Sequence, residues 1–145
     1  MKPLFIFITF LSSFFVSSTY AADPVSAQAV KSFQQTFTNA ENAVWTSSPN
    51  LYKVEFTLNG QAMTAFYNLQ GEFAGVTRNI SSLQLPVMLQ TEVKKDFSNY
   101  WITDLFELSN QNGTEYYVTL ENADTKIVLK SSGHSSWVTY QKSRK

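Results

Sequence analysis

YKVEFTLNG occupies residues 52–60 and sets the pattern from which the fold can be worked out. Large apolar side chains alternate with polar ones through this stretch: Tyr52, Val54, Phe56 and Leu58 against Lys53, Glu55 and Thr57. Successive side chains of a strand point to opposite faces, so the alternation predicts a strand with one buried face. Asn59 and Gly60 both tolerate positive φ and therefore predict a two-residue hairpin turn. We expect the returning strand over about residues 61–68.

The same pattern occurs a second time further along the chain. Each half has a helix-like stretch with a Phe and an Asn at its end, a strand that begins with Tyr, and a Gly turn: Phe37, Asn39, Tyr52 and Gly71, then Phe97, Asn99, Tyr116 and Gly133. The offsets between these landmarks are 60, 64 and 62 residues. A period of this length is too long for a solenoid and indicates a duplicated supersecondary unit.

Apolar residues at three- and four-residue spacing predict one helix in each half. In the first half this spacing covers about residues 24–38, and Asp23 and Pro24 suit the start of a helix. In the second half Leu85-Pro86 suits the start. The apolar face of the second helix is Leu85, Leu89, Val93 and Phe97.

Strands are expected after each helix, and Asn112-Gly113 is a further hairpin signal. Residues 79–84 are polar and are expected to link the two halves. The sequence therefore predicts an α+β fold of two tandem units, about 24–78 and 85–140. Each unit has one helix packed on a three- or four-stranded antiparallel sheet, and the outer face of the sheet is open.

The first residues are typical of a secretory signal peptide. Lys2 precedes an apolar run from Leu4 to Val16, and small residues follow up to Ala21 and Ala22. The run has 13 residues, whereas a membrane-spanning helix needs roughly 20. We therefore expect cleavage after Ala21 or Ala22 and no stable membrane anchoring.

These features divide the chain into three parts. We expect a signal peptide at 1–21, a single domain at 22–141 that contains both repeats, and a basic tail at 142–145. About 120 residues can bury enough surface for one domain. The mature protein is expected to be soluble and either periplasmic or secreted by a bacterium.

Composition argues against several classes of function. The chain has no cysteine, which excludes disulfides, thiolate metal sites and a cysteine nucleophile. Lys plus Arg and Asp plus Glu both number 11, so no net field attracts nucleic acid. One histidine without an acidic run cannot form a recognisable zinc or calcium site. We therefore predict no metal, no cofactor and no nucleic-acid partner.

Catalytic readings are not favoured either. His134 lies in a Gly- and Ser-rich segment that reads as a hairpin turn and lacks the strand-turn-helix context of a nucleophile elbow. Glu55 and Glu121 could in principle form an acid-base pair, but outward positions on strands are more often solvated. We therefore expect that the protein is not an enzyme.

Two segments resemble the bacterial PepSY-like family, also called beta-lactamase-inhibitor-like. Residues 37–45 read FTNAENAVW and are similar to that family's Phe, Asn, Ala, Asn, Trp signature. Residues 97–105 read FSNYWITDL and are similar to its second-unit pattern, and the likeness extends over residues 25–140. The resemblance implies a secreted or periplasmic protein of tandem helix-plus-sheet units, like a beta-lactamase inhibitor protein, and it brings no catalytic residues.

Most aromatic residues are in phase with the predicted buried faces, but Tyr67, Tyr117 and Trp137 differ. Tyr117 is out of phase with Tyr116 and Val118, so it should project from the face opposite the helices. Exposed aromatics among short polar residues on a rigid sheet favour protein recognition. The predicted partner-binding residues are Lys53, Glu55, Thr57, Tyr67, Tyr117, Thr119 and Trp137.

The resulting interpretation is an exported, non-catalytic protein that binds a protein or peptide of the cell envelope through an open sheet face and could act as an inhibitor. Two alternatives remain open. A small outer-membrane or envelope structural protein would also be exported and rich in strands, but the two predicted helices have no place in a barrel. An exported hydrolase would need a polar constellation that the sequence does not display.

Overall fold

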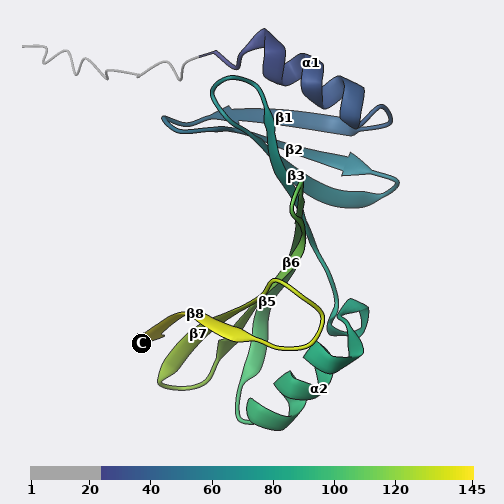
Figure 1. Ribbon diagram of the computed structural model, residues 1–145. Coiled ribbons are helices and arrows are strands. Elements are labelled where there is room, and N and C mark those ends of the chain that lie inside the picture. Colours follow the sequence, from purple (N-terminus) through teal and green to yellow (C-terminus); the bar gives the residue numbers. More distant parts are fainter. Residues whose placement is uncertain (1–23) are drawn as a thin grey trace, which may run out of the picture.

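The computed structural model describes residues 24–145 (Figure 1). The signal peptide predicted at 1–21 lies outside the described residues. In chain order the elements are α1 (Ala27–Thr36), β1 (Glu41–Ser47), β2 (Tyr52–Leu58), β3 (Gln61–Tyr67), β4 (Phe73–Asn79), a short 3-10 helix (Ser82–Gln84), α2 (Val87–Asp96), β5 (Trp101–Asn110), β6 (Gly113–Glu121), β7 (Thr125–Ser131) and β8 (Val138–Arg144). Each strand pairs with the next strand in sequence through a short connection, except that the 3-10 helix and α2 lie between β4 and β5.

The eight strands form a single antiparallel sheet in the order β1 to β8. β4 pairs with β5, with Val76 opposite Ser109, and the N–H of Ile80 donates to the carbonyl of Leu105 at 3.1 Å. The predicted architecture of two tandem units, each with its own three- or four-stranded sheet, is therefore wrong. Two separate sheets would each leave an unpaired edge strand, and pairing β4 with β5 satisfies both edges.

The two helices are shorter than the apolar spacing predicts. α1 was expected over residues 24–38, but it begins after Ser26, whose hydroxyl accepts a hydrogen bond from the N–H of Ala29 at 3.1 Å. Ser26 is thus the N-cap of α1, because its side chain satisfies a donor of the first turn. α2 begins directly after Pro86, as the Leu85-Pro86 pair predicts. Asn79, expected in a linker, is the last residue of β4.

Two hydrophobic clusters lie on the same face of the sheet. The first surrounds α1 and contains Phe33 and Val54, and the second surrounds α2 and contains Leu89 and Val118. The strand registers place Val54 and Val118 on one face of the continuous sheet. We call this the helix face. Between the two clusters, Arg78 on β4 forms an ion pair with Glu107 on β5.

The opposite face, here called the open face, carries the intervening residues of each strand. It includes Lys53, Phe66, Thr77, Phe106, Tyr117 and Val128, which the cross-strand registers bring side by side. Both helices pack on the helix face. The fold therefore leaves this second face available to solvent.

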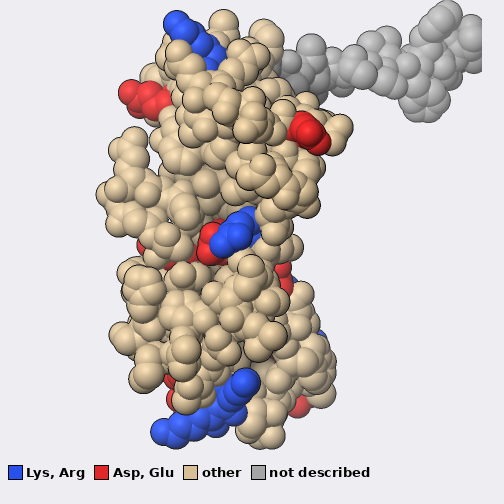
Figure 2. Space-filling model, turned by 90° about the vertical axis from the view of Figure 1, so that its right-hand side faces the viewer, with Lys and Arg blue, Asp and Glu red and all other residues tan. Residues whose placement is uncertain are grey.

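The sheet is strongly twisted, with α1 near one end of the molecule and α2 near the other (Figure 1). Figure 2 shows an elongated molecule that narrows between its two ends, and charged side chains are sparse on the side it presents. The two edge strands are irregular. The register shifts between Glu41 and Val44 in β1, and β8 shifts where it pairs with Val128 and Leu129.

The first predicted hairpin turn lies where the sequence signal places it, and the second lies one residue earlier than its signal. Asn59 and Gly60 have φ values of 51° and 77°, which confirms the predicted two-residue turn. In the second hairpin Asn110 pairs with Gly113, so the two loop residues are Gln111 and Asn112 rather than Asn112 and Gly113. Gly113 supplies a φ of 124° at the start of β6 instead.

Candidate binding surface

The centre of the open face is hollowed. The hollow has a volume of about 670 Å³ and is lined from every strand between β3 and β8. We call it the central hollow. Its lining residues are Phe66, Ala74, Gly75, Thr77, Asn79, Phe106, Leu108, Tyr117, Thr119, Val128 and Tyr140. They are mainly apolar and aromatic, with a few hydroxyl and amide groups, which is the composition of sites that bind apolar groups.

Tyr117 is the best-held side chain of the central hollow. Its ring stacks on that of Phe106, with the ring centroids 5.0 Å apart and the planes 9° from parallel. Tyr140 from β8 meets the Tyr117 ring edge-on, at 5.8 Å and 89°. Aromatic pairs in such stacked and edge-on arrangements are favourable. The three rings therefore form a fixed aromatic wall.

A polar cluster holds the hydroxyl end of Tyr117. Its hydroxyl donates to Glu115 at 3.1 Å, and the same carboxylate accepts from Lys130 at 2.9 Å and from Ser132 at 3.2 Å. The ammonium of Lys130 also lies 5.5 Å from the centre of the Tyr117 ring. The hydrogen bond from Lys130 lowers the pKa of Glu115, and the same bond raises the pKa of Lys130. Glu115 is therefore ionised at neutral pH and fixes the ring orientation.

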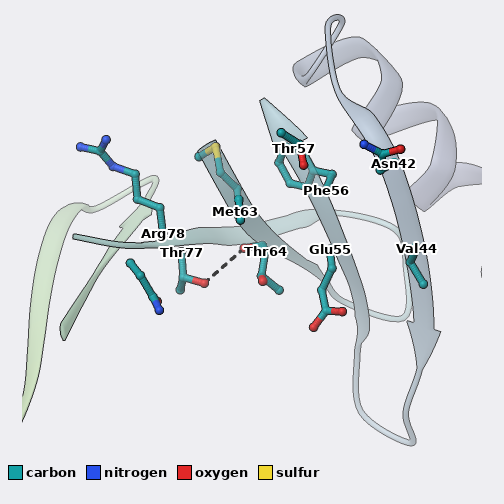
Figure 3. Close-up of a pocket in the computed structure, with 11 residues that line it drawn as sticks. Asn42, Val44, Glu55, Phe56, Thr57, Met63, Thr64, Thr77 and Arg78 are labelled. Carbon is teal, nitrogen blue, oxygen red and sulfur yellow. Dashed lines mark hydrogen bonds between the residues drawn. The ribbon is translucent and has the colours of Figure 1, made fainter. Parts of the chain in front are cut away.

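A second hollow of about 420 Å³ lies near β1 and β2, and we call it the end hollow (Figure 3). Figure 3 shows Glu55, Thr64 and Thr77 on one side of the strands and Met63 and Arg78 on the other. The Thr77 hydroxyl donates to the Thr64 carbonyl at 3.4 Å. The residues that line both hollows are Thr77 and Asn79, so the two hollows adjoin on the open face.

Solved structures from Bacteroides share this architecture. A BLIP-like protein from Bacteroides fragilis superposes with a TM-score of 0.72 and 18% identity, over 83% of this chain and 86% of that chain. The chain has a BLIP-like fold. A DUF2874 family protein from Bacteroides ovatus matches with a TM-score of 0.72 and 14% identity, over 84% of this chain and 89% of its own.

A protein from Bacteroides eggerthii, provisionally described as periplasmic, also has the BLIP-like fold. Its TM-score is 0.72 at 9% identity, and the match covers 83% of this chain and 89% of that chain. No family model matches the sequence, and no curated protein matches it. The structures support the beta-lactamase-inhibitor-like part of the resemblance seen in the sequence and do not support its PepSY-like part.

The BLIP-like fold brings five of the seven predicted binding residues onto the open face. Thr57 and Glu55 line the end hollow, and Lys53 contacts Glu55 at 2.8 Å. Tyr117 and Thr119 line the central hollow. These five residues thus occupy two adjoining parts of one surface.

The other two predicted residues lie in the cores of the BLIP-like fold. Tyr67 has no exposed surface and belongs to the cluster around α1, where its ring lies 5.7 Å from that of Trp45. Trp137 is 8% exposed, and its indole N–H donates to the carbonyl of Leu89 at 3.0 Å. Neither side chain can form part of the open face, because each fills space beside a helix.

Sequence reasoning missed the other aromatics of the central hollow, namely Phe66, Phe106 and Tyr140. A signal for Phe66 was available. The two-residue turn at Asn59-Gly60 fixes the register, so Tyr67 lies opposite Tyr52 on the helix face and Phe66 faces the other way. Tyr140 had no such signal, because it sits at the register shift in β8.

The chemistry of the remaining polar residues is limited. Between Pro24 and Lys145, no group of three or more His, Asp or Glu side chains is placed to hold a metal ion. His134 is exposed, and its ring lies 6.4 Å from that of Tyr116. Glu55 pairs with Lys53, and Glu121 pairs with Lys145 at 2.6 Å. None of the helices in the described part of the BLIP-like fold has the length and hydropathy needed to cross a membrane.

Proposed function

We propose that the protein is an exported, non-catalytic binding protein that recognises a protein or peptide through the open face of its sheet. The observation that carries the proposal is the central hollow, an apolar depression of about 670 Å³ on the face opposite both helices. Apolar depressions on an otherwise polar surface mark interaction sites, because leaving them in water is unfavourable.

The fixed geometry of Tyr117 supports the same reading. Phe106 and Tyr140 hold its ring, and Glu115 holds its hydroxyl group. A side chain that is already ordered loses little conformational entropy when a partner binds. Tyr residues in well-packed surroundings are common energetic centres of protein interfaces.

Export is supported by the signal-like sequence at residues 1–21 and by the provisional periplasmic description of the relative from Bacteroides eggerthii. Cell-envelope proteins are thus the expected partners. The absence of cysteine from the whole sequence is compatible with such a location, since an exported chain need not contain disulfides when its core is sufficient.

Photocrosslinking tests the proposal in cells of the source organism. A photoreactive residue at position 140, which is 64% exposed beside the central hollow, should capture a defined envelope protein, whereas one at the exposed Lys94 on α2 should not. The captured protein is then purified and its Kd measured. Tyr117→Ala should weaken that binding at least about tenfold, as expected for an interface hot spot.

The control is Leu83→Ala, which removes an apolar side chain that is 79% exposed beside α2. This variant should bind the captured protein as the unchanged protein does. Equal capture from positions 140 and 94, or equal losses from Tyr117→Ala and Leu83→Ala, would contradict the proposal.

Inhibition of a beta-lactamase is a second candidate, favoured by the BLIP-like description of the Bacteroides fragilis relative. The purified protein should then lower the rate of nitrocefin hydrolysis by at least one enzyme in a panel of beta-lactamases at micromolar concentration. The Tyr117→Ala variant should lose that inhibition. A panel left fully active would exclude this candidate while leaving the wider binding proposal in place.

A further inference from the structure

We propose that the central hollow receives an uncharged, apolar side chain from a loop of the partner protein, and that Asp104 pairs with a basic residue next to that side chain. This inference rests on the proposed function and specifies the chemistry of the partner. It follows from the lining of the central hollow and from the balance of charges around it.

The lining excludes a charged occupant. None of the residues that line the central hollow is Asp, Glu, Lys or Arg. A charge buried there would lose its hydration without gaining an ionic partner, and this cost is several kcal/mol by general estimates. Aromatic and aliphatic side chains are the groups that such a lining stabilises by removing apolar surface from water.

One residue that lines the central hollow, Gly75, has no side chain, and this lets a neighbouring side chain lie close to the backbone. A Cβ atom added to Gly75 would lie 3.0 Å from the Leu108 side chain and 3.3 Å from the Ser109 carbonyl. Leu108 therefore lies directly against the Gly75 backbone. The floor is apolar and flat there, whereas Phe66 on β3 and Tyr140 on β8 lie on the outermost of the lining strands.

The dimensions suit one or two side chains of a loop. The lining spans six neighbouring strands, which at about 4.8 Å per strand gives a length of roughly 24 Å. A volume of about 670 Å³ over that length is a shallow depression, too shallow to enclose a whole helix of 10–12 Å diameter. A loop that presents its anchor residue downwards fits this shape.

Most charges near the central hollow are already neutralised within the protein. Glu115 pairs with Lys130 at 2.9 Å, and Glu55 pairs with Lys53 at 2.8 Å. Asp104 is different. It is exposed, and no residue in the described part of the chain forms an ion pair or a side-chain hydrogen bond with its carboxylate.

Asp104 lies at the margin of the central hollow. It is directly opposite Thr119 in the β5–β6 pairing, and Thr119 lines the hollow. Residues that face each other in this way have Cβ atoms about 5 Å apart. The border of the hollow therefore carries one carboxylate without an ionic partner, whereas the neighbouring Glu121 already pairs with both Lys126 and Lys145. A Lys or Arg of the partner would complement Asp104.

Dipeptide amides test both parts of the proposal with the whole protein. Four N-acetyl dipeptide amides are titrated into the ¹⁵N-labelled protein. Three have phenylalanine first and lysine, glutamine or glutamate second, and are called the lysine, glutamine and glutamate compounds. The fourth, the seryl-lysine compound, has serine in place of phenylalanine. The phenylalanyl compounds should shift the amide signals of Phe66, Tyr117 and Tyr140. The lysine compound should bind about two- to fivefold more tightly than the glutamine compound, as expected for one exposed ion pair.

Two substitutions separate the contributions. Asp104→Asn should make the lysine and glutamine compounds bind equally. Tyr140→Ala should weaken all phenylalanyl compounds, whereas Leu83→Ala, at an exposed apolar residue beside α2, should change none of them. The seryl-lysine compound should produce no saturating shifts at the hollow.

Three results would overturn the inference: shifts centred away from the hollow, tighter binding of the glutamate than of the lysine compound, or no effect of Asp104→Asn. Capture of a partner at position 140 without any dipeptide binding would also overturn it and leave the proposed function standing. Dipeptide binding at the hollow with no captured protein would overturn the proposed function, and with it the protein origin of the bound side chain.

Discussion

Among the individual residues, Tyr67 has the least favourable surroundings for its polar atom. Its hydroxyl group is fully buried and has no hydrogen-bond partner in the described part of the chain, and burial raises its pKa to about 12. Tyr67→Phe should therefore leave the free energy of unfolding unchanged or raise it by up to about 1 kcal/mol, because no hydrogen bond is lost. Urea denaturation measures the change.

The control for this prediction is Tyr116→Phe in the cluster around α2, where the hydroxyl is not among the buried groups without a partner. It should have little effect on stability. A loss of more than about 1 kcal/mol in Tyr67→Phe alone would mean that the Tyr67 hydroxyl makes a hydrogen bond, for instance to a buried water molecule.

Glu115 should make the open face sensitive to acid. The hydrogen bond from Lys130 lowers the pKa of Glu115 in the folded protein, so the ionised form is stabilised by folding. Its contribution to stability is complete above the unfolded pKa near 4.5 and is lost as the pH falls through the lower folded value. Glu115→Gln should therefore show a smaller fall in stability between pH 6 and pH 3 than the unchanged protein.

Urea denaturation at several pH values checks this prediction, and the Tyr117 ring proton signals report the local change. Glu55→Gln is a matched control, because Glu55 lies on the same face and also pairs with a lysine, yet its side chain is 57% exposed whereas that of Glu115 is 23% exposed. Equal pH profiles for Glu115→Gln and the unchanged protein would show that Glu115 does not hold the aromatic wall in the proposed way.

The sequence allowed Tyr117 to be placed correctly but not Tyr67 or Trp137. Tyr117 has buried neighbours on both sides, so strand alternation alone decides its direction. Tyr67 is one residue from Phe66, and choosing between them requires the register set by the preceding turn. Trp137 is outside any strand, and its contact with Leu89 of α2 joins residues 48 apart in the chain, which no local pattern reveals.

At the scale of elements, α1 can pack closely on the turn before β4 because that turn contains a glycine. Gly71 has φ of +82°, and a Cβ added there would lie 2.7 Å from the N atom of Ala29 and 2.8 Å from the Gln28 side chain. Gly71→Ala should therefore displace α1 as well as strain the turn. We expect a loss of more than about 2 kcal/mol in the free energy of unfolding.

Gly60→Ala is the matched control, since Gly60 has a similar φ of +77° but no atom within 4 Å of an added Cβ. It should cost only about 1–2 kcal/mol, the usual penalty for a left-handed alanine. Chemical denaturation followed by circular dichroism measures both variants. Equal losses would mean that α1 does not pack closely on Gly71.

Elements with strong local patterns could be predicted from the sequence. Alternation located β2 and β6, and apolar spacing located both helices, although side-chain capping by Ser26 moved the start of α1. The second hairpin was placed one residue late, because the glycine signal marked the first residue of β6 rather than the turn itself. Boundaries of this kind depend on backbone hydrogen bonds that a pattern does not specify.

At the scale of the whole molecule, the pairing of β4 with β5 should make the two halves unfold together. Trp45 reports on the cluster around α1, and Trp137 belongs to the cluster around α2. In a Trp101→Phe background, Trp45→Phe and Trp137→Phe each leave one fluorescent reporter. In each variant, the urea midpoint measured by fluorescence should equal the midpoint measured by circular dichroism. We expect this because neither small core should be stable alone.

Far-ultraviolet circular dichroism provides the reference, since it reports on the helices and the sheet of both halves. A fluorescence midpoint that departs from the circular dichroism midpoint of its own variant would show that the halves unfold separately. Trp101 can be replaced safely, because its side chain is 54% exposed.

The single continuous sheet could not be predicted from the sequence, because the repeated pattern favoured two separate sheets. Two similar halves suggested two separate sheets, yet nothing in the local pattern of β4 or β5 states which strand will be its neighbour. Strand pairing between halves depends on backbone groups that every residue carries. The central hollow could not be predicted for the same reason, since its lining comes from both sides of the β4–β5 pairing.

The β4–β5 pairing runs through the middle of the central hollow, so it bears on how the affinity for a partner can evolve. Phe66 belongs to one half and Tyr140 to the other, and the ion pair between Arg78 and Glu107 joins the halves on the opposite side of the sheet. The β4–β5 hydrogen bonds and this ion pair together hold the two halves of the lining at one separation. Selection can therefore act on recognition through the contacts that join the two halves as well as through the lining residues themselves.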